Sequence, residues 1–138
     1  MRKKFKLDFD ELPSSTSQEK GYNRYTGVHF KKPKVEAAER MFFYKLKPHA
    51  PSAPSDKPIK LTVWFGFGIK QKSKWGQYKT TRPDTDNYIK TFKDVMTKCG
   101  FWLDDAQVVD ERTIKTFTES PFIWVEVEEV DKIFGGIS

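Results

Sequence analysis

Alternation of hydrophobic and polar residues predicts β-strands along this chain. It begins in a short segment in which Phe5, Leu7 and Phe9 alternate with polar residues, and it is unbroken over residues 59–67. Two more strands are predicted over 108–117 and 122–130. In the second of them Ile123, Val125 and Val127 alternate with Trp124, Glu126 and Glu128, and Ser120-Pro121 predicts the turn between the two strands.

Two other segments have the period of a helix. The first runs over residues 35–46. The second begins at Pro83-Asp84 and ends at Gly100, with Lys98 in its last turn. Its apolar stripe, spaced i, i+3, i+4 and i+7, consists of Tyr88, Ile89, Phe92, Val95, Met96 and Cys99.

Loops join these elements. Ser, Thr, Gly, Asn and Pro are frequent in residues 13–33, which predicts a loop, and three prolines with two serines predict an extended connector over 48–55. Residues 69–83 form a basic loop. The order β-α-β-α-β-β predicts one α+β domain over residues 1–138, a small mixed or antiparallel sheet with two helices.

Composition narrows the class of protein. A chain of 138 residues with 15% aromatics has enough large side chains for one core. No apolar run approaches the roughly 18 residues of a membrane span, and no apolar segment follows the basic start, so we expect a cytoplasmic protein without a secretory signal. Cys99 is the only cysteine, which excludes an internal disulfide framework, and with only His29 and His49 beside it a structural zinc site is not expected.

Charge is unevenly spread along the chain. The net charge is +6, but residues 1–83 contain 19 basic and 7 acidic side chains, whereas residues 84–138 contain 6 basic and 12 acidic ones. This asymmetry favours a polyanion-binding surface beside a site that uses carboxylates. A highly charged solvated surface is the alternative.

Acidic residues flank the second predicted helix. Asp84 and Asp86 lie at its start, and Asp104-Asp105 follow its end. Carboxylate and water oxygens are the ligands that Mg²⁺ takes, and a bound ion of this kind activates water for phosphodiester hydrolysis. Alternatively, Asp84 caps the helix, Asp86 complements its dipole and Asp104-Asp105 form a polar turn.

The spacing permits these carboxylates to meet. From Asp86 to Cys99 the helix rises roughly 20 Å. The six residues 100–105 span roughly 20 Å when extended, so they can return Asp105 to the start of the helix. We expect Phe101, Trp102 and Leu103 to be covered by packing on the way.

One stretch resembles a known family. Residues 82–90, R-P-D-T-D-N-Y-I-K, and 94–109, D-V-M-T-K-C-G-F-W-L-D-D-A-Q-V-V, resemble the RusA family of Holliday junction resolvases. The family's hallmark reads D-x-D-N-x-x-K, then D-A/V-x-x-K-x-G, then W-x-D-D-x-Q-V. Weaker similarity covers residues 12–14 and 22–25.

The resemblance implies a function and a site. Asp84, Asp86 and Asp105 would bind Mg²⁺, with Mn²⁺ as a substitute, and Lys90 would be essential for catalysis. The family acts on four-way DNA junctions as a homodimer and is often encoded by phages and prophages. No small-molecule cofactor and no membrane partner are implied, and Asp104 would orient ligands or lie in solvent.

Lys90 has two interpretations. It lies four residues after Asp86, where a helix-stabilising pair contributes only about 0.2–0.5 kcal/mol. Beside metal and phosphate, its ammonium would instead stabilise negative charge that develops on phosphate oxygens. The intact motif favours the catalytic role.

The basic loop is a candidate DNA contact. Cations bind phosphates with strong salt dependence, and aromatic rings stack on unpaired bases. Its candidate residues are Lys70, Lys72, Lys74, Trp75, Tyr78, Lys79 and Arg82. The alternative is a solvated loop whose aromatics fold onto the body, and the amino-terminal cations Arg2, Lys3, Lys4 and Lys6 have a weaker claim.

The leading hypothesis is a Mg²⁺-dependent endonuclease that resolves four-way junctions. Resolution needs paired nicks on opposite strands, and hence two active sites related by a two-fold axis. The rival hypotheses are a DNA-binding module without catalysis and a metal-dependent nuclease that acts on other branched or single-stranded DNA.

Overall fold

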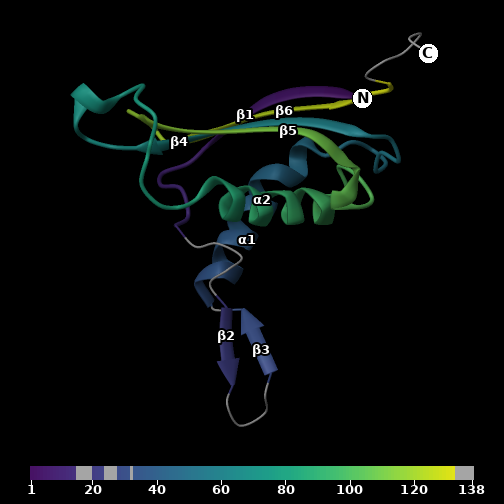
Figure 1. Ribbon diagram of the computed structural model, residues 1–138, viewed down its shortest axis with the longest axis horizontal. Coiled ribbons are helices and arrows are strands. Elements are labelled where there is room, and N and C mark those ends of the chain that lie inside the picture. Colours follow the sequence, from purple (N-terminus) through teal and green to yellow (C-terminus); the bar gives the residue numbers. More distant parts are fainter. Residues whose placement is uncertain (15–19, 24–27, 32, 133–138) are drawn as a thin grey trace.

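A computed structural model of the chain describes residues 1–14, 20–23, 28–31 and 33–132. A four-stranded mixed sheet forms one layer, and helices α1 (Pro33–Leu46) and α2 (Thr85–Cys99) lie on the same face of it (Figure 1). The sheet order is β1-β6-β4-β5, with β1 at Arg2–Asp8, β6 at Phe122–Glu129, β4 at Ile59–Gly68 and β5 at Val108–Thr118. The predicted α+β class is confirmed.

The β4-α2-β5 connection determines where α2 lies. β6 is antiparallel to both β1 and β4, whereas β4 and β5 are parallel. Parallel neighbours need a crossover, and here the crossover contains α2. The helix that carries the candidate acidic residues is therefore fixed against the sheet.

Two predicted loops contain regular structure. The predicted loop 13–33 is wrong in part, because β2 (Lys20–Asn23) and β3 (Val28–Lys31) pair as an antiparallel hairpin that extends away from the sheet (Figure 1). Strands of four residues are too short to show a clear period in the sequence. The proline-rich connector begins with a single 3-10 turn at Lys47–His49, and the basic loop contains another at Lys72–Lys74.

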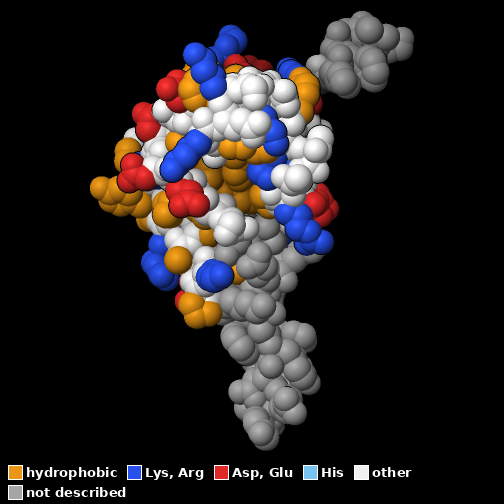
Figure 2. All heavy atoms as spheres, turned by 90° about the vertical axis from the view of Figure 1, so that its left-hand side faces the viewer, with side chains coloured by type: hydrophobic (Ala, Val, Ile, Leu, Met, Phe, Trp, Pro, Cys, Tyr) orange, Lys and Arg blue, Asp and Glu red, His pale blue; other side chains and the backbone are white. Residues whose placement is uncertain are grey.

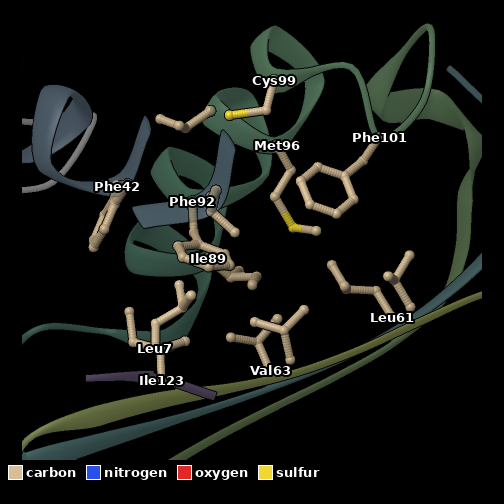
Figure 3. Close-up of a cluster of buried hydrophobic side chains, with 14 of the residues drawn as sticks. Leu7, Phe42, Leu61, Val63, Ile89, Phe92, Met96, Cys99, Phe101 and Ile123 are labelled. Carbon is tan, nitrogen blue, oxygen red and sulfur yellow. The ribbon is translucent and has the colours of Figure 1, made fainter. Parts of the chain in front are cut away.

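The core lies between the sheet and the two helices. All six residues of the predicted apolar stripe of α2 are buried. Side chains of α2 such as Met96 point toward Leu61 and Val63 of β4 (Figure 3). Phe42 of α1 meets Phe92 of α2 edge to face, with ring centroids 5.1 Å apart. No helix in the part of the chain that the structure describes is long and apolar enough to cross a membrane.

Both ends of α2 are where the sequence predicts them. Asp84 is the N-cap, and Gly100 ends the helix in the left-handed region at φ 92°. Its N–H donates to the Thr97 carbonyl, and the Phe101 N–H donates to the Met96 carbonyl. This glycine-dependent ending reverses the chain and buries Phe101 and Trp102 directly after the helix.

Candidate active site

Two carboxylates at the start of α2 are exposed, and neither caps the helix. Asp84 has the extended backbone of an N-cap (φ −70°, ψ 144°), but its side chain accepts no capping hydrogen bond. Asp86 lies in the first turn, and both side chains are exposed. The capping alternative for Asp84 is therefore not realised, and its oxygens are available to a ligand.

Two lysines hold the turn that leads into Asp84. Lys115 of β5 donates to the Thr81 carbonyl at 2.7 Å and to the Pro83 carbonyl at 2.6 Å. Lys79 donates to the Thr81 hydroxyl at 2.6 Å and to the Arg82 carbonyl. Burial lowers the pKa of Lys115, opposed by the nearby Asp84 carboxylate, and burial with the neighbouring Lys115 charge lowers the pKa of Lys79.

Asp104 has a structural role at the other end of α2. It caps the 3-10 turn at Asp105–Gln107, and its carboxylate accepts the Ala106 N–H at 2.8 Å. The Gln107 side-chain oxygen accepts the Leu103 and Asp104 N–H groups, and its amide donates to the carbonyls of Ser55 and Lys57. This network fixes the turn and does not include the Asp105 carboxylate, which bonds to Thr97 of α2.

Asp105 faces the C-terminal half of α2. Its Oδ1 accepts the Thr97 hydroxyl and lies 3.3 Å from the Trp102 indole nitrogen, which itself donates to Thr97 Oγ1 at 2.7 Å. Asp94 shares a hydrogen bond with Asp105. Burial, this hydrogen bond and the Asp105 charge raise the pKa of Asp94 to about 6. Burial also acts to raise the pKa of Asp105, but the bonds from Asp94, Thr97 and Trp102 outweigh it and lower that pKa.

The two carboxylate pairs lie apart on one chain. Asp86 and Asp94 are eight residues apart, about 12 Å along the helix axis. The return of Asp105 to the start of α2, which the spacing permits, therefore does not occur within one chain. The turn after Gly100 is tight, and Trp102 and Thr97 retain Asp105 at the near end. Leu103, expected to be covered, is 64% exposed.

A Mg²⁺ site needs more than one chain offers in this arrangement. Oxygen donors suit the ion, and carboxylates are present at both positions. Yet among the residues that the structure describes, no three acidic, histidine or cysteine side chains converge to hold a metal. Within one chain the donor set fits Mg²⁺ in chemistry and not in geometry.

Lys90 lies between the two pairs on the exposed side of α2. It makes no ion pair with Asp86, and none with any other residue in the described part of the chain. Its charge acts on Asp94, lowering the pKa of that group. No contact with Asp86 therefore supports the interpretation of Lys90 as a helix-stabilising partner of that residue.

The basic loop divides into outward and inward residues. Lys70, Lys72, Arg82 and Tyr78 are exposed, whereas the Trp75 indole donates to the Ile69 carbonyl at 2.8 Å. The loop borders a hollow of about 660 Å³, lined by Lys70, Trp75, Lys79 and Arg82 among others. Figure 2 shows this side of the molecule, with hydrophobic side chains inside the hollow and Lys and Arg beside it.

Other cations that the sequence predicts as DNA contacts interact with residues of the same chain. Lys79 points inward to the turn before Asp84, and Lys74 lies over the Phe117 ring at 5.9 Å. At the amino terminus, Lys4 pairs with Glu126 at 3.2 Å, and Arg2 pairs with Glu128 at 3.7 Å. Because Arg2 and Lys4 are paired with acidic residues of β6, they are weaker candidates for DNA contacts than the exposed cations of the basic loop.

The sequence prediction omitted two residues that the structure brings to the candidate site. Asp94 lies within the matched motif, and its position eight residues after Asp86 on the same helix was a usable signal. Lys115 lies in the last part of β5, where an alternating pattern gives no sign that one lysine reaches a distant turn. Pairing of the basic loop with the end of β5, where Tyr78 bridges Thr116 and the Lys79 N–H donates to the Lys115 carbonyl at 3.0 Å, brings Lys115 close to residues 81–83.

Comparison with known proteins gives consistent matches. The family model described as endodeoxyribonuclease RusA matches residues 11–128. A crossover junction endodeoxyribonuclease from Lactococcus phage r1t is 36% identical over 94% of the chain and the whole of that relative. The crossover junction endodeoxyribonuclease RusA of Escherichia coli K12 is 62% identical over 59 residues, 43% of the chain and 49% of the relative. YqaN of Bacillus subtilis, an uncharacterised protein, is 40% identical over 54% of the chain and 52% of its own length.

Proposed function

This chain belongs to the endodeoxyribonuclease RusA family, and we propose that it is a Mg²⁺-dependent endonuclease that resolves four-way DNA junctions. The observation that carries the proposal is the pair of exposed carboxylates, Asp84 and Asp86, which have no capping role and lie beside a basic loop. The relative that matches over its full length is named for the same reaction. Phage and bacterial relatives support action in the bacterial cytoplasm.

Asp84, Asp86 and Asp105 would hold the metal, with Asp94 beside Asp105. When bound, Mg²⁺ supplies an activated water and stabilises the leaving oxygen of the phosphodiester. The Lys90 ammonium lies between the two acidic pairs, where it would stabilise negative charge on phosphate oxygens. Exposed cations of the basic loop, Lys70, Lys72 and Arg82, would contact the DNA backbone.

A homodimer would complete the site. If a two-fold axis crosses α2 near its middle, the α2 helices of two subunits lie antiparallel. The Asp84 and Asp86 pair of one subunit then faces the Asp94 and Asp105 pair of the other, and the same contact occurs twice. Two equal sites are what paired nicks on opposite strands require. The separation of the acidic pairs along one helix supports this arrangement.

The function is tested by incubating the protein with synthetic four-way, flap and duplex DNA, with Mg²⁺ or with EDTA. We expect symmetric nicks in the four-way junction only when Mg²⁺ is present. Binding without cleavage under both conditions would favour a non-catalytic DNA-binding module. Preferential cleavage of flaps or single strands would favour a different nuclease.

Mixed dimers test whether the site is shared. Asp86→Asn and Asp105→Asn should each abolish cleavage while retaining junction binding, because each removes one expected metal ligand. Co-expressed with two different tags and purified as heterodimers, the two variants regain one intact site if the site is shared. The heterodimer should nick single strands without resolving the junction. If each chain holds a complete site, the heterodimer stays inactive.

An untagged mixture gives a second readout. With random pairing about half of the dimers are heterodimers, so about one quarter of the wild-type sites are restored. Light scattering of the purified protein checks the dimer itself. A monomer at the concentrations used for cleavage would overturn the shared site directly.

A further inference from the structure

Lys115 reaches from the sheet to the turn before the candidate metal ligands. Its side chain is half-buried on the strand β5, and its ammonium donates to two carbonyls of the turn, Thr81 at 2.7 Å and Pro83 at 2.6 Å. It makes no ion pair with a carboxylate in the part of the chain that the structure describes. A half-buried ammonium that donates to two backbone oxygens restrains the conformation of that backbone.

The turn receives a second bond from Lys79. Its ammonium donates to the Arg82 carbonyl and the Thr81 hydroxyl. Residues 81–83 thus accept hydrogen bonds from two cations, and no helical or sheet hydrogen bond fixes them. Hydrogen bonds from charged donors are shorter and stronger than neutral ones, so these contacts can set the conformation of an irregular segment.

The conformation of this turn determines where Asp84 points. Asp84 follows Pro83 directly, and its carboxylate has no bond to the helix amides that would orient it. Its direction is therefore set by the backbone that enters the helix. A shift of about 1 Å in a positioned group is enough to lower the rate of a reaction about 100-fold.

We propose that Lys115 is a positioning residue, which holds the Thr81 and Pro83 carbonyls so that Asp84 is presented as a ligand at the start of α2. The inference rests on the proposed function, because it takes Asp84 as part of the nuclease site. Two of the three donors of the Lys115 ammonium are occupied inside the protein, which favours a positioning role over a phosphate contact.

The test compares Lys115→Met with Lys115→Arg and with a matched control, Lys60→Met. Lys60 is an exposed lysine on the adjacent strand β4 and has no place in the proposed site. Four quantities are measured: melting temperature, junction affinity in EDTA, single-turnover cleavage rate across a Mg²⁺ titration, and hydrogen exchange of peptides covering residues 80–86.

For Lys115→Met we expect faster exchange at residues 80–86 and cleavage slowed by about 10-fold or more, with half-maximal rate reached only at higher Mg²⁺. Junction affinity should remain within about threefold, because the DNA-contacting cations are unchanged. Lys115→Arg should recover most of the rate, since a guanidinium can donate to both carbonyls. Lys60→Met should match the wild type in all four.

Three results would overturn the proposal. One is unchanged exchange and rate in Lys115→Met. Another is a loss of junction affinity as large as the loss of rate, which would make Lys115 a DNA contact. The third is a slow Lys115→Arg whose exchange at residues 80–86 is normal. If the wild type itself cleaves no junction, the proposed function fails, and the exchange data alone then decide whether Lys115 holds the turn.

Discussion

Replacing Lys90 with alanine separates a helix-stabilising lysine from a catalytic one by magnitude. On α2 the Lys90 side chain is exposed and pairs with no acid, Asp86 included, in the described part of the chain. Its removal should therefore cost at most the 0.2–0.5 kcal/mol or so of a surface helix pair. As a cation that stabilises charge in the reaction, its removal should resemble the loss of one oxyanion donor, about 10²–10³-fold in rate or about 2.7–4 kcal/mol of barrier.

The assay is single-turnover cleavage of a four-way junction with enzyme in excess, so that binding is saturated and the rate reports the chemical step. Lys90→Ala should lose at least about 100-fold while its melting temperature stays within about 2 °C of the wild type. Lys90→Arg should recover only part of the rate, because a guanidinium keeps the charge without the compact geometry of an ammonium. Arg40→Ala is the control for a surface helix pair, since Arg40 is an exposed cation of α1 that lies 4.0 Å from its i,i+4 partner Glu36 and has no place in the proposed site.

A rate for Lys90→Ala within about threefold of the wild type would refute the catalytic role, because the expected effect is at least 30 times larger than that margin. A large drop in melting temperature with a proportional loss of activity would also refute it. In that case Lys90 would support the fold through a contact that the isolated chain does not have.

The remaining predictions concern the capping residues, the basic loop and the thiol. Asp84→Asn should abolish cleavage, because it removes an expected metal ligand. Asp104→Asn should retain most of the cleavage rate, because asparagine caps as well as aspartate. Equal rates for the two variants would contradict the assignment of Asp84 as a ligand and Asp104 as a cap. Neutralising Lys70 and Lys72 together should flatten the slope of log K against log salt by up to about 2, and an unchanged slope would show that they do not contact the DNA. Burial raises the pKa of Cys99 to about 11, despite the nearby Lys47 charge. The native thiol should therefore resist disulfide reagents at pH 9 until guanidinium unfolds the protein. Because the folded state keeps a proton that the unfolded state releases, stability should also fall as pH rises from 9 to 11.

The fold could be predicted because its strands and helices are long and periodic. The stripe from Tyr88 to Cys99 is buried as expected, and the unbroken alternation over 59–67 matches β4. The hairpin of β2 and β3 could not be predicted, because each strand has only four residues. Periodicity needs several repeats before it can be distinguished from chance.

The position of Asp105 shows the limit of reasoning from chain length. Six residues after α2 are long enough to reach its start, but length gives only the maximum reach of a segment. Gly100 turns the chain sharply, and the Trp102 indole binds Thr97, so the chain stays at the near end of the helix. These are specific local hydrogen bonds, which neither composition nor spacing encodes.

Asp84 and Asp104 show why one sequence signal can have two meanings. Each aspartate is the N-cap of a helical segment in the structure, although from the sequence capping is an alternative only for Asp84 and a polar turn is the alternative for Asp104. The Asp104 oxygen accepts the Ala106 N–H, and the Gln107 side chain completes the capping box. The Asp84 side chain accepts no such bond, and the turn before it is held by lysines from the sheet and the loop, which donate to its carbonyls. A carboxylate that accepts no hydrogen bond from the helix keeps its oxygens available for a ligand, and this difference separates the candidate metal ligand Asp84 from the structural Asp104.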